Sequence, residues 1–489
     1  MAGREADTRW PDGEPRLPRP QTGELSADSV YFFMWPGWRD ELESNRWHWS
    51  KRWARRLPVV LIQPELAAGE AVCAIPEPRL ENVDLLSIEQ RSVTAQDWLV
   101  TGLRQAGQIA GHMRARGHQC PLFWFYNPHF VVPYALLPSR GRVFHATENY
   151  FDFPDLKDDF PDGLAFLNCY RYAIESSDLA ICCSSGIADS LARNTRRTEF
   201  LTLPNGCDFL KYSKPAATRG DWPARFADWQ QTDRRVAVFA GGINNRLDFA
   251  LIETLVARHS ELGFVFAGPV ELEPLSAAQL SWERVQRALN VCVLGRIPTE
   301  DLPALYWCCD VGFIPYRTDL PMIVENGFPL KALEMAAAGL PVVATLMKPL
   351  REVAGAVTVA RDAEAFCGAL SNQSRRIRST AERKVAEQIC RAYDYDLLFE
   401  RMANALATQI GDHQCRPADL AALVERIGLD CYNEGIGRLG QIHCVFGSSP
   451  VRSRARTSIL YRIGALLGKN FPRVRQRGQC RSGDLIGDA

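Results

Sequence analysis

The sequence predicts an α/β protein built from two doubly wound, Rossmann-like domains that face a shared cleft. At 489 residues the chain is too long for one ordinary hydrophobic core. Short apolar runs alternate with helix-like segments in two separate series. A polar, proline-containing connection, residues 213–233, separates the two series and is typical of a linker between domains. In such sheets ligands bind beyond the carboxyl ends of the strands, which predicts a site in the cleft.

The first series, residues 29–212, predicts the N-terminal domain. Its expected strands are VYFFMW, PVVLIQPE, PLFWFYNP, RVFHATENY, DLAICCSS and EFLTLPNGCD. The expected helices are NRWHWSKRWARRL, AQDWLVTGLRQAGQIAGHMRARG, a segment around residues 162–176, and GIADSLARN. Buried strands that alternate with helices favour a parallel sheet.

The second series, residues 234–410, predicts the C-terminal domain in the same way. Its expected strands are RVAVFAGG, GFVFAGP, NVCVLGR, DVGFIPY, LPVVAT and AVTVA. Helical segments lie between them, among them RLDFALIETLVARHS, TEDLPALYWCC and PLKALEMAAAG. Two consecutive domains of this kind form a clam-shell.

The two ends of the chain differ from these domains. Residues 1–28 are polar and proline-rich and lack the apolar core of a signal peptide, so we expect a disordered leader. Residues 411–489 form an extension that is basic from 451, with nine Lys/Arg and no acid in 451–481. Two interpretations stay open for 451–481: a poorly ordered tail or edge-packing helix, or a basic amphipathic helix on an anionic membrane surface.

Bulk composition excludes several classes of protein. Lys+Arg and Asp+Glu balance at 57 each, so we expect no nucleic-acid partner. No apolar run is long enough for a transmembrane helix, which favours a cytoplasmic location, at the inner face of the membrane if the tail binds it. The fifteen cysteines form no CxxC pair, so we expect buried free thiols rather than disulfides or a metal site. The candidate strand–helix turns MWPGWRD and FAGGINNRLD do not have the GxGxxG spacing that a dehydrogenase carries there. The chain also lacks GxxxxGK[ST], GxSxG and HExxH, the signatures of P-loop NTPases, serine hydrolases and zinc proteases.

The stretch ENGFPLKALEMAAAGLPVVAT, residues 325–345, carries the strongest local signal. Pro329 fits the start of a helix and Gly339 its left-handed cap. Free N–H groups at a helix start can hold a phosphate, and Lys331 adds a positive charge there. Glu334, three residues later, can accept two hydrogen bonds from a ribose diol. The alternative is a surface ion pair between Lys331 and Glu334.

This stretch resembles the nucleotide-binding segment of the retaining, clam-shell (GT-B) glycosyltransferases of group 1, or family four. NVCVLGRIPTEDLPALYWCCDVGFIPY and VFAGGINNRLDFALIETLVARHSELGFVFAGP are similar to further segments of that family, as are DLAICCSSGIADSL and LPNGCD in the first domain. The resemblance covers about residues 120–370 in consistent order. LFWFYNPHF and RVFHATENYFDF resemble a bacterial subgroup that makes surface polysaccharides, including teichuronic-acid-type enzymes.

The resemblance implies transfer of a sugar from a nucleotide-diphosphate sugar to a hydroxyl acceptor with retention of configuration. The acceptor would be a sugar or a lipid-linked molecule in cell-surface polysaccharide or glycolipid synthesis. The resemblance implies no cofactor and no metal, and the adjacent acids of KDDF, residues 157–160, do not have the spacing of a DxD motif. In this family the leaving phosphate is expected to take the acceptor proton, so no dedicated nucleophile is needed.

The resemblance also implies roles for individual residues. Arg246 and Lys331 would stabilise the charge that develops on the diphosphate as the glycosidic bond breaks. The donor-binding residues would be Gly241, Gly242, Arg246, Arg296, Pro298, Asn326, Leu330, Lys331 and Glu334. Arg296 and Pro298 would line the base pocket, and Glu334 would bind the ribose. For Arg246, the alternative is a surface arginine in a helix's first turn.

One position departs from the family pattern. Many relatives carry two acids in an E-x7-E arrangement, and eight positions before Glu334 stands Asn326, with Glu325 one position out of register. Either Glu325 shifts in through the turn at Gly327, or the protein works without this acid. The identity of the donor sugar depends on the answer.

In the first domain, His145 and Glu148 are the candidate catalytic residues. They follow a predicted strand and are expected to face the cleft near sugar and acceptor. The alternative is a histidine buried under the domain and a glutamate that caps the following segment. Other polar and aromatic residues share the same placement at strand ends, with structural roles as the alternative: Asn127, His129, Trp35, Gly37 and Trp38.

Three other functions compete with a transferase. A clam-shell nucleotide-sugar epimerase would use the same cleft but no acceptor. A non-catalytic nucleotide-sugar binder would fit the asparagine at position 326. A membrane-surface assembly factor would act through the basic tail.

Overall fold

The computed structural model describes the two domains and little of either terminus. The described residues are 26–34, 37–38, 41–67, 69–90, 95–152, 163–215, 222–375, 379–410, 417–418, 420 and 422–423. The predicted leader lies outside this part except for its last three residues, and the basic residues 451–481 and Trp35 lie outside it entirely. Their expected properties therefore stay predictions. Among the described helices, none has both the length and the apolar character that a membrane span requires.

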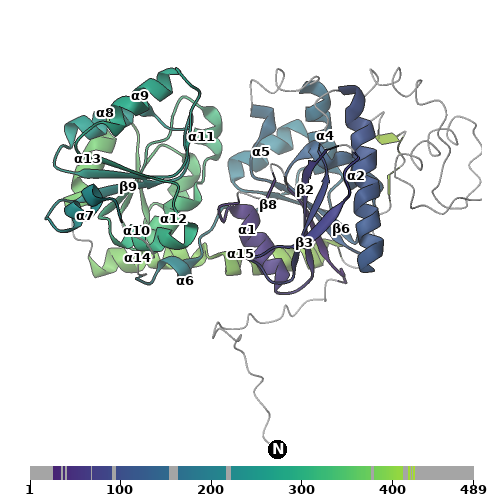
Figure 1. The fold of residues 1–489 in the computed structure, drawn as a ribbon. Helices are drawn as coiled ribbons and strands as arrows, with labels where there is room; N and C mark the ends of the chain where they lie inside the picture. The colour runs from purple at the N-terminus through teal and green to yellow at the C-terminus, as the bar shows by residue number, and fades with distance from the viewer. Residues whose placement is uncertain are drawn as a thin grey trace, which may run out of the picture.

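The first domain is built on an eight-stranded sheet with the strand order β3-β4-β2-β1-β5-β6-β7-β8 (Figure 1). Neighbouring strands are parallel, except that β3 and β4 are antiparallel. The strands are β1 (Val30–Phe33), β2 (Val59–Leu66), β3 (Cys73–Pro76), β4 (Val83–Glu89), β5 (Leu122–Phe125), β6 (Gly141–Ala146), β7 (Leu179–Cys182) and β8 (Leu201–Thr202). The strand order reverses between β1 and β5, which is where doubly wound sheets open a ligand crevice.

Helices cover both faces of this sheet. Alternate residues of β1 point to opposite faces, so Tyr31 and Phe33 belong to one hydrophobic cluster while Val30 and Phe32 belong to another. The helices are α1 (Asn45–Ala54), α2 (Ala95–Arg116), η1 (Pro128–Phe130), α3 (Val131–Leu136), η2 (Tyr150–Asp152), α4 (Gly163–Glu175) and α5 (Ser185–Asn194). The long helix α2 ends at Gly117, whose φ of +73° gives the expected left-handed stop.

The second domain holds a six-stranded parallel sheet with the order β13-β11-β9-β14-β15-β16. The strands are β9 (Val236–Ala240), β11 (Gly263–Ala267), β13 (Val291–Gly295), β14 (Val311–Ile314), β15 (Val342–Thr345) and β16 (Val357–Ala360). Two short strands, β10 (Ile243–Asn244) and β12 (Val270–Glu271), pair separately. Read along the chain this is the doubly wound order 3-2-1-4-5-6, with its switch point between β9 and β14.

The helices of the second half complete its two outer layers. They are α6 (Phe209–Tyr212), α7 (Ala224–Gln230), α8 (Phe249–Arg258), α9 (Ala277–Gln286), η4 (Thr299–Asp301), α10 (Leu302–Trp307), α11 (Pro321–Asn326), α12 (Leu330–Ala337), η5 (Lys348–Val353), α13 (Ala363–Arg375), α14 (Thr380–Ala392) and α15 (Tyr395–Ile410). Pro329 is the residue before the first turn of α12, and Gly339, with φ +87°, follows its end. Gly312 of β14 allows α12 to pack closely on the sheet, because a Cβ at this position would lie 2.5 Å from Met335 Sδ of the helix.

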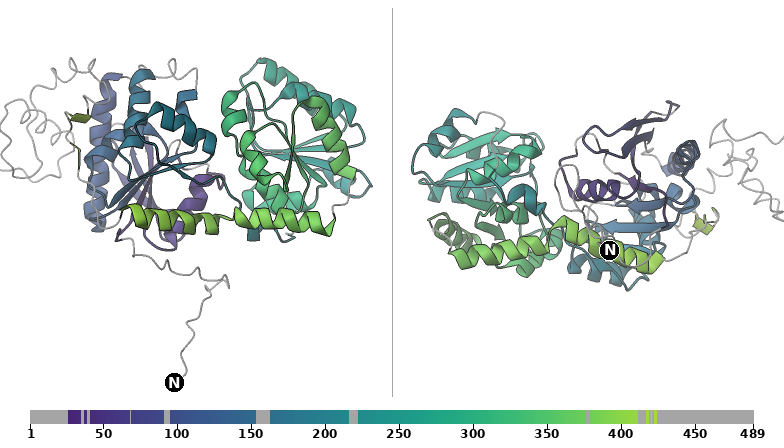
Figure 2. Two further views of the ribbon diagram at one scale, coloured as in Figure 1. Left: turned by 180° about the vertical axis from the view of Figure 1, so that it is seen from behind. Right: turned by 90° about the horizontal axis from the view of Figure 1, so that it is seen from below.

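The last helix, α15, leaves the second domain and packs on the first. Figure 2 shows α14 and α15, in light green, running one after the other beneath the two domains. Apolar side chains of α15 belong to the same cluster as Trp49 and Trp124 of the first domain. Arg52, a buried residue of α1, forms an ion pair with Asp396 at 2.5 Å. Residues 395–410, expected in the C-terminal domain, therefore complete the core of the N-terminal one.

The prediction of an α/β chain with two doubly wound domains is confirmed. All strands expected from the sequence are present, while β3, β4 and the two-residue strands β10 and β12 were not predicted. The connection 213–233 is not structureless, because it contains α7. Trp229 of this helix packs against the second sheet, where a Cβ at Gly263 would lie 2.5 Å from its ring.

Candidate functional site

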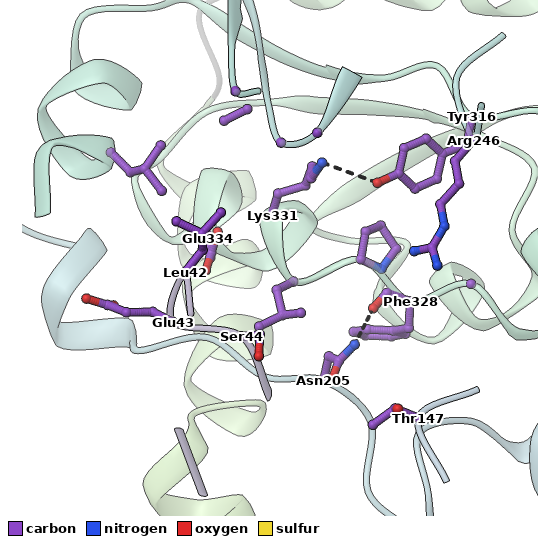
Figure 3. A pocket seen from close by; sticks show the side chains of 18 of the residues that line it. Leu42, Glu43, Ser44, Thr147, Asn205, Arg246, Tyr316, Phe328, Lys331 and Glu334 are labelled. Atoms are coloured by element: carbon purple, nitrogen blue, oxygen red, sulfur yellow. Dashed lines mark hydrogen bonds between the residues drawn. The ribbon is translucent and has the colours of Figure 1, made fainter. Parts of the chain in front are cut away.

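A cavity lies between the two domains, at the carboxyl ends of the strands of both sheets. Its volume is about 380 Å³. The first domain contributes residues 42–44 before α1, residues 147–149 after β6, Cys183, and Asn205. The second contributes the segments 240–242, 267–269, 296–297 and 326–331, together with Tyr306, Tyr316 and Glu334 (Figure 3). The cleft predicted from the topology is thus a real cavity.

Lys331 projects into this cavity from the first turn of α12. Its Nζ lies 4.1 Å from the centroid of the Phe239 ring and donates a hydrogen bond to Tyr316 Oη at 3.2 Å (Figure 3). Gly241, at the end of β9, has φ +144°, and a Cβ there would lie 2.0 Å from Lys331 Nζ. The glycine turn therefore leaves the space that the ammonium group occupies.

The start of α12 faces the same space. Leu330 and Lys331 are its first two residues, and neither an acidic side chain in the first turn nor a side-chain cap is present. The backbone N–H groups at a helix start have no partners within the helix, and they carry partial positive charge. Together with the Lys331 ammonium they favour an anion at this end of the cavity.

Glu334 lies one turn further along α12 and is buried, with 8% of its surface exposed. Burial raises the pKa of its carboxyl group to about 7, and nearby Glu43 adds to the rise. Lys211, Lys331 and a hydrogen bond from Tyr212 oppose it. Close to neutral pH the group can therefore exist as a carboxylate that accepts hydrogen bonds, or as a neutral acid.

Glu43 and Lys211 form an ion pair near Glu334 at this end of the cavity. Their side chains meet at 2.6 Å, and Glu43 takes a left-handed backbone conformation with φ 55°. Non-glycine residues in this conformation are uncommon and concentrate at functional sites. Neither residue was a candidate from the sequence, because they come from two segments that meet only in the folded chain.

Arg246 and Glu148, both predicted site residues, form an ion pair across the cleft. Arg246 Nη2 donates to Glu148 Oε1 at 2.9 Å, and both side chains are partly exposed. The ion pair connects the first domain, where Glu148 follows β6, to the second domain, where Arg246 lies between β9 and α8. The structure thus brings together a cation expected to bind phosphate and a carboxylate expected to act near the acceptor.

Only some of the residues expected to line the base pocket lie at the cavity. Arg296 and Ile297 line the cavity, while Pro298 does not and instead precedes η4. Tyr306 was not anticipated as a site residue. Its ring lies against Tyr212 with a centroid distance of 5.8 Å, and its buried hydroxyl has no hydrogen-bond partner among the described residues.

His145 does not face the cleft, and this expectation was wrong. Strand β6 extends to Ala146, so His145 lies within the sheet and is fully buried. Its ring packs against Trp124 and Tyr126, and Nε2 lies 3.6 Å from Cys183 Sγ. Burial lowers the pKa of the imidazole to about 3, which keeps it neutral. The structural alternative, a core histidine, is the one observed.

The side chains of Asn127 and His129 make contacts within the first domain and do not point into the cavity. Asn127 caps η1, accepting a hydrogen bond from the His129 amide at 2.9 Å and donating one to Tyr150 Oη at 2.9 Å. The His129 ring packs against Phe166. Trp38 is buried and donates to Glu77 Oε1 at 3.3 Å. None of these side chains lines the cavity.

The structure shows which of Glu325 and Asn326 occupies the position of the first acid in the E-x7-E pattern. Asn326 lines the cavity, whereas Glu325 points away and pairs with Lys348 at 2.6 Å on the surface. The turn at Gly327 does not bring the glutamate in. In the described part of the chain, no group of three or more His, Cys, Asp or Glu side chains is arranged to hold a metal ion.

The comparisons with known proteins agree with this geometry. Residues 234–374, which carry Gly241, Arg246, Lys331 and Glu334, match the family model "Glycosyl transferases group 1". The chain resembles the group 1 glycosyl transferases. It is also 27% identical over 245 residues to the "Putative teichuronic acid biosynthesis glycosyltransferase TuaH" of Bacillus subtilis (strain 168). That alignment covers 47% of this chain and 56% of the relative, so the chain spans little more than half the length of the curated relative it matches.

Solved structures resemble this chain in fold. Sucrose-phosphate synthase from Thermosynechococcus elongatus superposes with a TM-score of 0.59 at 13% identity, covering 78% of this chain and 98% of that one. The structure described as "Trehalose-6-phosphate from E. coli bound with UDP-2-fluoro glucose" gives a TM-score of 0.55 at 14% identity, covering 77% of this chain and 98% of that one. At these identities the likeness shows the fold alone. The resemblance to group 1 glycosyl transferases and the GT-B clam-shell fold, both expected from the sequence, are confirmed.

Proposed function

We propose that the protein is a glycosyltransferase that moves a sugar from a nucleotide-diphosphate sugar to a hydroxyl acceptor, with retention of configuration. The observation that supports it most is the placement of Lys331 and Glu334 on one face of α12, toward the same cavity. A cation at the helix start suits a diphosphate, and a buried carboxylate one turn away suits a ribose diol. By analogy with TuaH, the acceptor belongs to cell-surface polysaccharide or glycolipid synthesis.

The proposed chemistry needs charge stabilisation more than a nucleophile. The diphosphate becomes more negative as the glycosidic bond breaks, and Lys331, Arg246 and the amides at the start of α12 stabilise that charge. The acceptor oxygen bonds to the anomeric carbon on the face from which the diphosphate leaves, and this same-face attack gives retention. The leaving phosphate takes the proton of the acceptor hydroxyl. Glu148, on the first domain's side of the cleft, would bind the sugar or the acceptor hydroxyl.

The first experiment is a donor screen followed by a transfer assay. Thermal shift with UDP-, GDP- and ADP-sugars is expected to select one nucleotide. Release of the nucleoside diphosphate should then rise at least ten-fold when oligosaccharide or lipid-linked acceptors are added. Acceptor-independent conversion of the donor would favour an epimerase, and tight binding without turnover would favour a non-catalytic binder. Either result would contradict the proposal.

Glu148→Gln is expected to change nucleotide binding and transfer in opposite directions. The substitution removes the anion that pairs with Arg246 and leaves the cation for the diphosphate. Since a partly exposed ion pair is worth about 0.2–1 kcal/mol, affinity for the nucleoside diphosphate should rise by up to about five-fold while the transfer rate falls. Isothermal titration calorimetry and the transfer assay measure the two effects.

The matched control for this prediction is Glu253→Gln. It breaks an exposed ion pair with Arg284 at 2.7 Å, far from the cavity, and should change neither quantity. A fall in nucleotide affinity for Glu148→Gln would mean that Glu148 does not compete with the diphosphate for Arg246.

A further inference from the structure

Two helix ends from different domains meet beside the cavity. Helix α11 of the second domain ends at Asn326, and α5 of the first domain begins at Ser185. A Cβ at Gly186 would lie 2.6 Å from Asn326 Oδ1 and 2.7 Å from the Glu325 carbonyl oxygen. Only a glycine at position 186 leaves room for this contact. The carbonyl end of one helix also meets the amide end of another, which is a favourable arrangement of partial charges.

A carboxylate from the first domain lies at the centre of this contact. Asn326 Nδ2 donates a hydrogen bond to Asp152 Oδ2 at 3.4 Å. Asn149 Nδ2 donates to the same Asp152 oxygen and also to Ser190 Oγ at 2.8 Å. Asn149 is 2% exposed, so its amide is held firmly by the first domain. One carboxylate is thus shared by two amides, one from each side of the interface.

This arrangement explains why an amide, and not an acid, stands at position 326. A carboxylate at 326 has no N–H to donate, and it would place a second negative charge within hydrogen-bonding distance of Asp152. Like charges at this separation repel, and the repulsion acts across the domain interface. The carboxylate beside position 326 is that of Asp152, which the first domain supplies.

We propose that Asp152 and Asn326 are positioning residues that hold the two domains at the separation required for transfer. Asn149 orients the Asp152 carboxylate, and Gly186 sets how closely α5 and α11 approach. The contact fixes the distance between the loops that carry Glu148 on one side and Arg246 on the other. Its effect on transfer rests on the proposed function, whereas the contact between domains does not.

The test is a charge exchange between the two positions. Wild type, Asn326→Asp, Asp152→Asn and the double variant are compared for transfer kinetics, for affinity toward UDP as the probe, and for radius of gyration by small-angle X-ray scattering. Asn326→Asp is expected to lower kcat/KM by at least ten-fold and to enlarge the radius of gyration. Asp152→Asn should lower kcat/KM by about three-fold. The double variant, with amide and acid exchanged, should recover to within about three-fold of wild type.

A steric variant tests the same interface without changing charge. Alanine is a better helix former than glycine, so Gly186→Ala does not weaken α5 itself, but its Cβ collides with Asn326 and the Glu325 carbonyl. It should open the domains as Asn326→Asp does, and Asp152→Asn should not rescue it. The control is Gly368→Ala in α13, where a Cβ meets nothing within 4 Å and neither kinetics nor shape should change.

The outcomes separate this inference from the proposed function. If the losses of kcat/KM in Asn326→Asp and Asp152→Asn simply add up in the double variant, with no recovery, the positioning role is overturned. Wild-type behaviour of Asn326→Asp would overturn it as well. If the wild type binds UDP but shows no such coupling, only this inference fails. If the wild type binds no nucleoside diphosphate, the proposed function fails, while scattering from the four proteins still decides whether Asp152 and Asn326 hold the domains together.

Discussion

Lys331→Ala is expected to lower the affinity for nucleoside diphosphates by about 30- to 100-fold. Hydrogen bonds to charged groups are worth on the order of 1.5–3 kcal/mol, and the ammonium is the cation nearest the start of α12. In the part of the chain that the structure describes, Lys331 contacts Phe239 and Tyr316 but no carboxylate. Its charge is therefore available to an anionic ligand. Isothermal titration calorimetry with UDP, GDP and ADP measures the loss.

The control for this prediction is Lys348→Ala. Lys348 lies on the surface of the same domain, where it pairs with Glu325. Its removal should leave nucleotide affinity within two-fold of wild type, and both variants should keep the wild-type circular dichroism spectrum. Unchanged affinity in Lys331→Ala would mean that the anion site at the start of α12 has been assigned wrongly.

Glu334→Gln is expected to stabilise the protein and to impair nucleotide binding at the same time. The carboxyl group is buried and its pKa is about 7, so at pH 8 the folded protein must hold a charge that burial disfavours. Glutamine has nearly the same shape without the charge, and unfolding free energy at pH 8 should rise by on the order of 1–3 kcal/mol. Affinity for the nucleotide should fall at least ten-fold if Glu334 binds the ribose diol as proposed, because the substitution removes the charged hydrogen-bond acceptor.

The pH dependence of these effects follows from the direction of the pKa shift. Below about pH 4.5 the group is protonated in both folded and unfolded chains, so wild type and Glu334→Gln should be equally stable. As pH rises above this value, Glu334 loses its proton in the unfolded chain before it does so in the folded protein. The wild type should therefore lose stability relative to the variant until pH passes about 7. Nucleotide affinity of the wild type should rise over the same interval, as the carboxylate forms.

Urea unfolding and calorimetry between pH 5.5 and 8.5 measure both trends. Glu387→Gln, an exposed residue of α14, is the control and should show neither. A wild-type affinity that does not change with pH would show that the ionised form of Glu334 is not what binds the ligand.

The sequence predicts the elements that rest on local patterns. The strands at the centre of each sheet are continuous apolar runs, and Pro329 and Gly339 mark the two ends of α12 by their backbone preferences alone. Strand β3 escaped prediction because it is a short, exposed edge strand with no apolar face. Lys331 and Glu334 could be assigned to one site because a helix fixes their relation over a single turn.

The other site residues could not be placed from the sequence, because their positions depend on contacts between segments that are far apart in the chain. His145 lies two residues before a plausible cleft position, and its burial is decided by Trp49 from α1 and Trp124 from β5. Tyr306, Glu43 and Lys211 enter the site from three separate segments. The role of Asn326 becomes clear only when Asp152, 174 positions away in the sequence, is seen beside it.

The return of α15 to the first domain has a consequence for how the chain folds. Cys207 and Asp394 form a parallel β-bridge where the chain passes from the first domain to the second and back again. At the end of α15, Ile410 packs tightly on Gly141, where a Cβ would lie 2.2 Å from Ile410 Cδ1. One layer of the first domain's core therefore stays open to water until the last turns of α15 have been synthesised. Ribosomal synthesis is sequential, so the second sheet has all its strands before the first domain is closed. A fragment that stops before residue 395 would expose Trp49, Trp53 and their neighbours, so we expect the N-terminal half to fold poorly when it is produced alone.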